Sequence, residues 1–86
     1  MSAVTDAIIR TRGHLQHALL LSRRLDKALV DAALCHAGGS LDDAMGKVEW
    51  ADTVLDALCT QVELCRIAIA REGETQQPVQ SEEVAV

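Results

Sequence analysis

Residues 41–71 read LDDAMGKVEWADTVLDALCTQVELCRIAIAR, and this stretch decides the fold. Every seventh residue is a large aliphatic one, in the series Leu41, Val48, Leu55, Val62 and Ile69. A second series starts three residues later and holds small or aliphatic side chains: Ala44, Ala51, Leu58 and Cys65. Apolar residues at positions a and d of a heptad are typical of a helix that packs against other helices. The stretch therefore predicts one long helix over residues 41–72, with Gly73 as its stop.

The residues before this stretch predict a second helix of similar length, over 3–37. Its apolar residues follow three-four spacing through Val4, Ile8, Leu15, Ala18, Leu25, Leu29 and Ala32. Gly13 interrupts the pattern, and glycine inside a helix costs about 1 kcal/mol relative to alanine. Because the stripe keeps its phase across Gly13, we expect one continuous helix. The alternative fold is a three-helix monomer broken at Gly13.

Gly38, Gly39 and Ser40 separate the two predicted helices. A glycine just past a helix end supplies the left-handed conformation that closes the last turn. Ser40 then caps the next helix, with Asp43 three residues later as in a capping box. The sequence therefore predicts an all-α protein built as an antiparallel αα-hairpin. Residues 1–72 form the helical domain in this prediction, and 73–86 form a disordered acidic tail with the only proline.

The composition favours self-association of this hairpin. The chain has 86 residues, no Phe or Tyr and one Trp, so its core is made of short aliphatic side chains. A lone pair of helices buries one strip per helix, which rarely offsets about 1–2 kcal/mol of conformational entropy per ordered residue. We therefore expect a homodimeric four-helix bundle. Its seam and dimer contacts are predicted at Leu15, Ala18, Leu25, Leu29, Val48, Ala51, Leu55, Leu58, Val62, Cys65 and Ile69.

The bulk charge and the cysteines narrow the classes of partner and compartment. A net charge of −5 and a pI near 4.9 disfavour non-specific binding to nucleic acid or to anionic membrane. Three cysteines, an odd number, are not a secreted disulfide framework. The amino-terminal residues lack the pattern of a signal peptide, and no apolar run is long enough for a membrane span. We expect a cytoplasmic protein with reduced thiols.

The charges divide unequally between the two predicted helices. Residues 1–37 carry five Lys or Arg and three Asp or Glu, whereas 38–72 carry three and seven. In an antiparallel hairpin the basic residues Arg23, Arg24 and Lys27 lie level with Asp56, Asp52 and Glu49, respectively. We expect these groups to pair between the helices and to set their orientation.

Several residues outside the stripe are candidates for binding another protein. A lone Trp on an aliphatic protein is either a core edge or an interface anchor, and apolar residues off the stripe indicate a second buried face. The predicted partner-binding set is Trp50, Leu19, Leu20, Leu34, Asp52 and Asp56.

Metal binding is a further hypothesis. His14 and His17 are three residues apart on the first helix, and the hairpin register places Cys59 and Glu63 at about the same level. Such a set could hold zinc, although its spacing lacks the close cysteine pair of structural zinc sites. No phosphate-binding loop, nucleophile elbow or zinc-protease motif occurs in the sequence, so we expect neither catalysis nor a cofactor.

These observations favour a non-enzymatic protein–protein interaction module, such as an adaptor, a chaperone-like subunit or a small regulator. It would bind itself and another protein, the latter through an apolar groove near Trp50. The alternative is a small acidic inhibitor that blocks a larger protein or a nucleic-acid-binding machine with its acidic helix face. A metal-binding helical protein is the third hypothesis.

Overall fold

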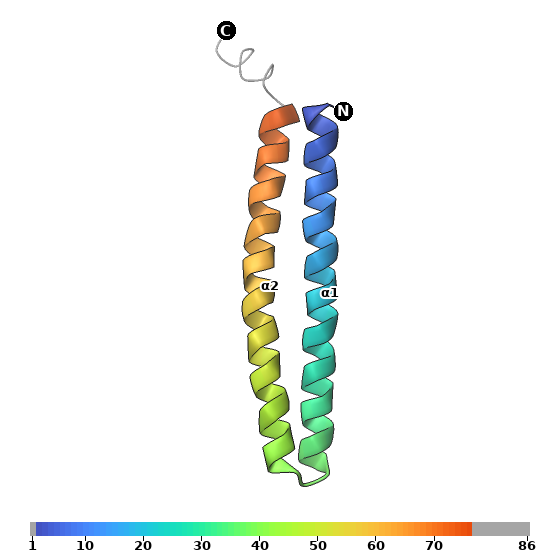
Figure 1. Ribbon diagram of the computed structural model, residues 1–86, viewed down its shortest axis with the longest axis vertical. Helices are drawn as coiled ribbons and strands as arrows, with labels where there is room; N and C mark the ends of the chain where they lie inside the picture. Colours follow the sequence, from blue (N-terminus) through green and yellow to red (C-terminus); the bar gives the residue numbers. More distant parts are fainter. Residues whose placement is uncertain (1, 77–86) are drawn as a thin grey trace.

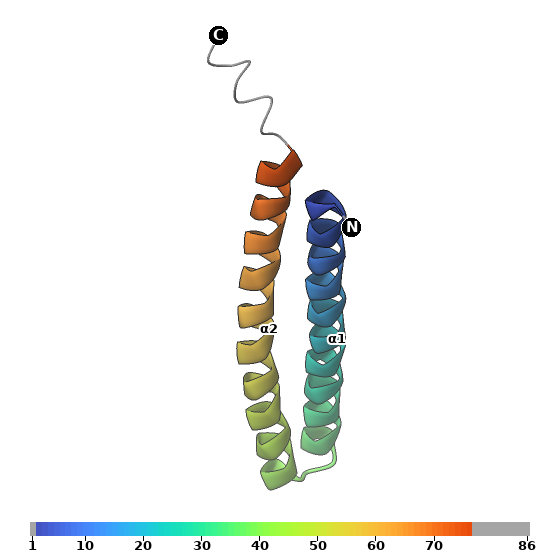
Figure 2. The same ribbon diagram turned by 45° about the horizontal axis from the view of Figure 1, so that its top comes forward.

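Two long helices lie side by side and antiparallel along their whole length (Figure 1). The computed structural model describes residues 2–76, with α1 at Ala3–Ala37 and α2 at Leu41–Gln76. At 1.5 Å per residue each helix is about 50 Å long. The second view shows the same two-helix arrangement with the chain reversing at one short turn (Figure 2). The prediction of an all-α antiparallel hairpin is confirmed.

The first helix begins at a side-chain cap and continues without a break. The Ser2 hydroxyl accepts a hydrogen bond from the Thr5 backbone N–H at 3.1 Å, which satisfies one of the free donors of the first turn. Helical geometry then passes through Gly13, so the prediction of one continuous helix is confirmed and the three-helix alternative is wrong. The cost of one glycine is small beside the stabilisation that packing along α1 supplies.

The turn between the helices is a Schellman motif. Gly39 has φ of 83°, in the left-handed region that glycine adopts without steric cost. The Ser40 N–H donates to the Cys35 carbonyl at 2.9 Å, and the Gly39 N–H donates to the His36 carbonyl at 3.0 Å. These two bonds satisfy carbonyls that the end of a helix leaves free. The short turn forces α2 to return directly along α1.

The second helix begins after Ser40, but its end differs from the prediction. The Ser40 hydroxyl donates to the Asp43 carboxylate at 2.8 Å, which joins the two predicted capping residues through their side chains. The prediction that Gly73 stops the helix is wrong, because α2 continues to Gln76. Glu74 and Gln76 favour helix, and one internal glycine is not enough to end it. Residues 73–76 of the tail predicted for 73–86 are therefore helical, and its residues 77–86 lie outside the described residues.

The core between the helices is thin and consists mostly of small side chains. Among the described residues eight apolar side chains are buried, of which five are alanines and the other three are Leu21, Val54 and Cys65. The buried alanines are Ala28, Ala32, Ala44, Ala51 and Ala68. Small residues let two helices approach closely, but each removes little apolar area from water. Most of the large aliphatic side chains are therefore left outside this core.

The ion pairs of Lys27 and Arg66 lie within a helix rather than between helices. Lys27 pairs with Asp31 at 3.2 Å, and Arg66 pairs with Glu63 at 2.7 Å. The expected pairing of Arg23, Arg24 and Lys27 with carboxylates of α2 is wrong for the described residues. Glu49 and Asp56 lie on the outer side of α2, where their side chains cannot reach across to α1.

Candidate interaction surfaces

The predicted seam and dimer residues fall into two groups in the single chain. Ala51 and Cys65 are buried between the helices, and Ala18, Leu25 and Leu58 are half-buried there. The other six are exposed, namely Leu15, Leu29, Val48, Leu55, Val62 and Ile69. On α2 the division follows the heptad, because its d positions face α1 and its a positions face solvent.

The exposed residues form a surface that we call the aliphatic face, defined by Leu15, Leu29, Leu41, Val48, Leu55, Val62 and Ile69. Their exposed fractions range from 42% to 67%. Those of α2 recur every seven residues, and Leu15 and Leu29 lie two such intervals apart on α1, with Ser22 between them. Seven-residue spacing holds residues on one side of a supercoiled helix. Both helices thus contribute to one apolar surface on the same side of the hairpin.

A groove shows that the two helices share this side. It lies between the helices near the turn, and its lining residues are Leu25, Leu29, Val48, Ala51, Asp52 and Leu55. Leu29 comes from α1, whereas Val48 and Leu55 come from the exposed a positions of α2. The floor is aliphatic, and the carboxylate of Asp52 is its one charged group. Such a groove suits the aliphatic side chains of another helix.

The opposite side of the hairpin carries Trp50 in a more basic setting. A shallow groove there is lined by Arg24, Lys27, Ala28, Asp31, Lys47 and Trp50. The indole is 54% exposed. The sequence predicted an apolar groove near Trp50, but the groove carries three cationic side chains and one carboxylate. Its chemistry suits an acidic partner better than a purely apolar one.

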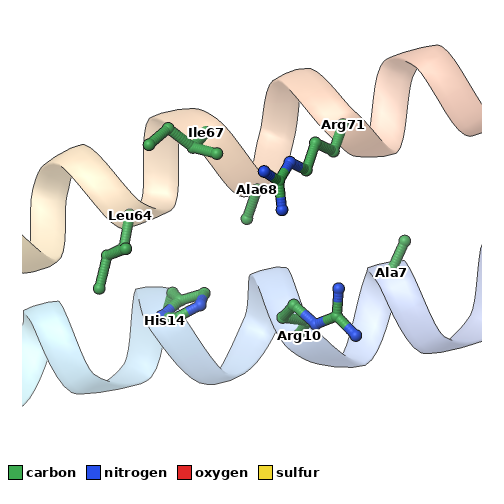
Figure 3. A pocket seen from close by; sticks show the side chains of 7 residues that line it. All are labelled: Ala7, Arg10, His14, Leu64, Ile67, Ala68 and Arg71. Atoms are coloured by element: carbon green, nitrogen blue, oxygen red, sulfur yellow. The ribbon is translucent and has the colours of Figure 1, made fainter.

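A third hollow lies on the same side as Trp50, near the ends of the chain. It is lined by Ala7, Arg10, His14, Leu64, Ile67, Ala68 and Arg71 (Figure 3). Arg10 comes from α1 and Arg71 from α2, and the side chain of Arg71 extends from α2 toward α1. The aliphatic side chains of Leu64 and Ile67 supply the apolar part of the lining.

The structure also shows a polar network in the seam that sequence reasoning missed. Gln61 is buried between the helices, where its Nε2 lies 2.7 Å from His14 Nδ1 and its Oε1 lies 2.9 Å from His17 Nδ1. The same Nε2 donates to the His14 carbonyl at 3.3 Å. Gln61 is seven residues from the buried Val54 and Ala68, and this spacing is the signal that could have placed it in the seam.

The predicted partner-binding residues are not brought together on one surface. Leu19 and Asp52 lie toward the aliphatic face, because Leu19 is one helical turn after Leu15 and Asp52 lines the groove with Val48 and Leu55. Trp50, Leu20 and Leu34 lie toward the opposite side, and Asp56 lies on the outer side of α2. All six are exposed. The set therefore spans two surfaces.

The residues proposed for metal binding have other surroundings. His14 and His17 contact the Gln61 amide, and Glu63 pairs with Arg66. The hydrogen bond to Glu63 and the charge of its carboxylate both raise the pKa of Arg66. Among the described residues, no three His, Cys, Asp or Glu side chains lie close enough together to hold a metal ion.

Over the part of the chain that the structure describes, no helix is long and apolar enough to cross a membrane. Comparisons with protein-family models, with the curated proteins and with the solved structures each find no match. The function of the chain is therefore inferred from the chemistry of the surfaces described above.

Proposed function

We propose that this protein is a non-enzymatic protein–protein interaction module that acts through helical packing. The aliphatic face is the surface through which it associates, and a homodimeric four-helix bundle is the form in which it acts. The observation that carries this proposal is the division of the heptad on α2, where the d positions Ala51 and Cys65 are buried and the a positions Leu55 and Val62 are exposed. A helix of a four-helix bundle buries the side chains at both its a and its d positions. A helix of a lone hairpin buries only one of these two series.

The energetics support association through this face. Complete burial of one Leu, Ile or Val side chain is worth about 1.5–3 kcal/mol, and seven such residues define the aliphatic face. The core within one hairpin, made largely of alanines, contributes far less for each residue. Large exposed apolar surfaces on small proteins mark interaction sites. A second apolar layer would also supply the stability that a two-helix chain lacks.

The test is the mass in solution, measured by light scattering coupled to size exclusion at two protein concentrations. A mass near twice 9.3 kDa supports the proposal. A mass of 9.3 kDa at both concentrations, with helical circular dichroism retained, contradicts self-association through the aliphatic face.

A second candidate function, a small acidic inhibitor, is favoured by one specific surface. The outer side of α2 presents a row of exposed carboxylates at seven-residue spacing: Asp42, Glu49, Asp56 and Glu63. Such a row could occupy a groove that otherwise receives nucleic acid phosphates. The two functions respond differently to salt. Binding through the acidic row should weaken steeply between low and high ionic strength, whereas association through the aliphatic face should change little.

A further inference from the structure

Along α1 the aliphatic face has an outer edge formed by Arg12, Leu19 and Asp26, and the charges of this edge are in a symmetric order. Arg12 and Asp26 lie seven residues before and seven residues after Leu19, so the three share one position of the helix. All three are exposed, and neither Arg12 nor Asp26 forms an ion pair with another described residue. The edge thus runs from a cation, through a leucine, to an anion.

The edge on α2 repeats this order around Cys59. Asp52 lies seven residues before Cys59 and Arg66 lies seven residues after it. Gln61 contacts both His14 and His17, so Cys59, two residues earlier, lies about level with Leu19. Asp52 lines the same groove as Leu25, the residue before Asp26, so the two aspartates lie near the same level of the hairpin. The end of the face near the termini thus carries two arginines, and the end near the turn carries two aspartates.

From this order we infer that the partner at the aliphatic face is a second copy of the chain, related by a twofold axis between Leu19 and Cys59, so that the two turns lie at opposite ends of the bundle. This inference rests on the proposed function and adds the identity, direction and register of the partner. Each α1 then packs against the other copy's α1, and each α2 against the other copy's α2, in antiparallel fashion.

This direction brings opposite charges together along both edges. Arg12 meets Asp26 of the second copy, and Arg66 meets Asp52 of the second copy, with each pair formed twice. Arg66 already binds Glu63 on its own helix at 2.7 Å, but a guanidinium has five N–H donors and can bind a second carboxylate. With the two turns at the same end, Arg12 would instead meet Arg66 and Asp26 would meet Asp52. Like charges placed across an interface disfavour that arrangement.

The same register also matches the apolar residues. On α2, a centre half a residue before Cys59 places Leu55 against Val62 of the second copy and Val48 against Ile69 of the second copy. On α1, a centre half a residue before Leu19 places Ile8 against Leu29 of the second copy and Leu15 against Ser22 of the second copy. The centre of symmetry near Leu19 follows from α1 alone, and the centre near Cys59 follows from α2 alone. The two centres lie at about the same level of the hairpin. One rigid twofold operation therefore satisfies both edges.

Charge reversal tests the direction. Arg12→Glu should raise the Kd of the dimer about tenfold at low salt, because two weak ion pairs become two repulsive contacts. Adding Asp26→Arg in the same chain should restore the dimer by recreating both pairs with reversed sign. With the turns at one end, Arg12→Glu would tighten the dimer, because it would replace an arginine that faces Arg66. Tightening by Arg12→Glu, or failure of the double variant to recover, overturns the inference.

Arg23→Glu is the matched control, because it makes the same change of charge at an exposed site on the outer side of α1. It should leave the Kd within about twofold of the original value, since charges outside the interface are screened. An Arg23→Glu effect equal to that of Arg12→Glu would mean that net charge, rather than the proposed pairs, controls association.

Cys59 gives a second, geometric test on the unaltered chain. Its side chain is exposed and lies at the proposed axis, so the two copies of Cys59 face one another. A short bis-maleimide should link two chains through this residue, and Cys59→Ser should abolish the linked dimer while Cys35→Ser should retain it. A dimer by mass that gives no Cys59 linkage overturns the inference but not the proposed function. A chain that is monomeric by mass overturns both.

Discussion

At the scale of single residues, the backbone at Gly39 should control stability more than any other glycine in the chain. A Cβ atom at this position would meet no other atom within 4 Å, so the positive φ of 83° is the sole obstacle to a larger residue. Gly39→Ala should lower the free energy of unfolding by about 1–2 kcal/mol, because L-residues disfavour this conformation. Urea denaturation followed by circular dichroism measures the change.

Gly13→Ala is the matched control for this prediction. Gly13 also has open space around it, but its conformation is helical. Alanine should therefore raise the free energy of unfolding by about 0.5–1 kcal/mol. If both variants changed stability in the same direction, the assignment of Gly39 to the left-handed position of the turn would be contradicted.

The Gln61 network should respond differently to loss of one partner and to loss of its centre. His14→Ala leaves the buried amide short of an acceptor and should cost about 1 kcal/mol. Gln61→Leu removes the buried polar group itself and should cost less or stabilise, because the half-buried His14 and exposed His17 can turn to water. Thermal unfolding of the two variants compares them. A larger loss for Gln61→Leu than for His14→Ala would show that the network stabilises the seam.

At the scale of the elements, the two apolar series of α2 should separate folding from association. Leu55 is exposed in one chain, so Leu55→Asp should leave the hairpin geometry possible but place a charge within the bundle. We expect it to weaken the dimer by about 3 kcal/mol. The measurement is the protein concentration at which half of the chains are monomeric. Thr60→Asp, on the outer side of the same helix, should leave that concentration unchanged.

Leu58→Asp belongs to the other series and should act on the hairpin itself. Leu58 is half-buried against α1, so a carboxylate there loses hydration without gaining a partner. We expect loss of helical circular dichroism at every protein concentration, in contrast to Leu55→Asp, whose helicity should recover as concentration rises. Equal behaviour of the two variants would contradict the division of the heptad between the two interfaces.

The elements are also where sequence reasoning succeeds and where it stops. The heptad of Leu41–Arg71 and the glycines before it were enough to predict two antiparallel helices, because spacing and turn chemistry are local properties. They could not show that one chain buries Ala51 while it leaves Leu55 exposed, because both lie on one stripe and only the packing of α1 distinguishes them. Gln61 was missed because a polar residue breaks an apolar pattern, and Gly73 misled because one glycine does not end a helix.

At the scale of the whole molecule, a dimer that folds as it associates should melt at a temperature that depends on concentration. A folded state stabilised by a second chain gains free energy by mass action, so Tm should rise as protein concentration rises. Calorimetry over a hundredfold range of concentration measures this dependence. A Tm that stays constant over that range would mean that the hairpin is stable as a single chain.

The fluorescence of Trp50 reports which side of the hairpin is covered in the assembly. It is the one Trp of a chain without Phe or Tyr and lies on the side opposite the aliphatic face, where its side chain is 54% exposed. If the dimer forms through the aliphatic face, the indole stays in water in the assembled dimer, where acrylamide should still quench it strongly. The quenching is measured above the dissociation range, with free tryptophan amide as the fully exposed reference. A shift of the emission to shorter wavelength in the dimer, with loss of quenching, would place the interface on the side of Arg24, Lys47 and Trp50 and would contradict the arrangement proposed for the aliphatic face.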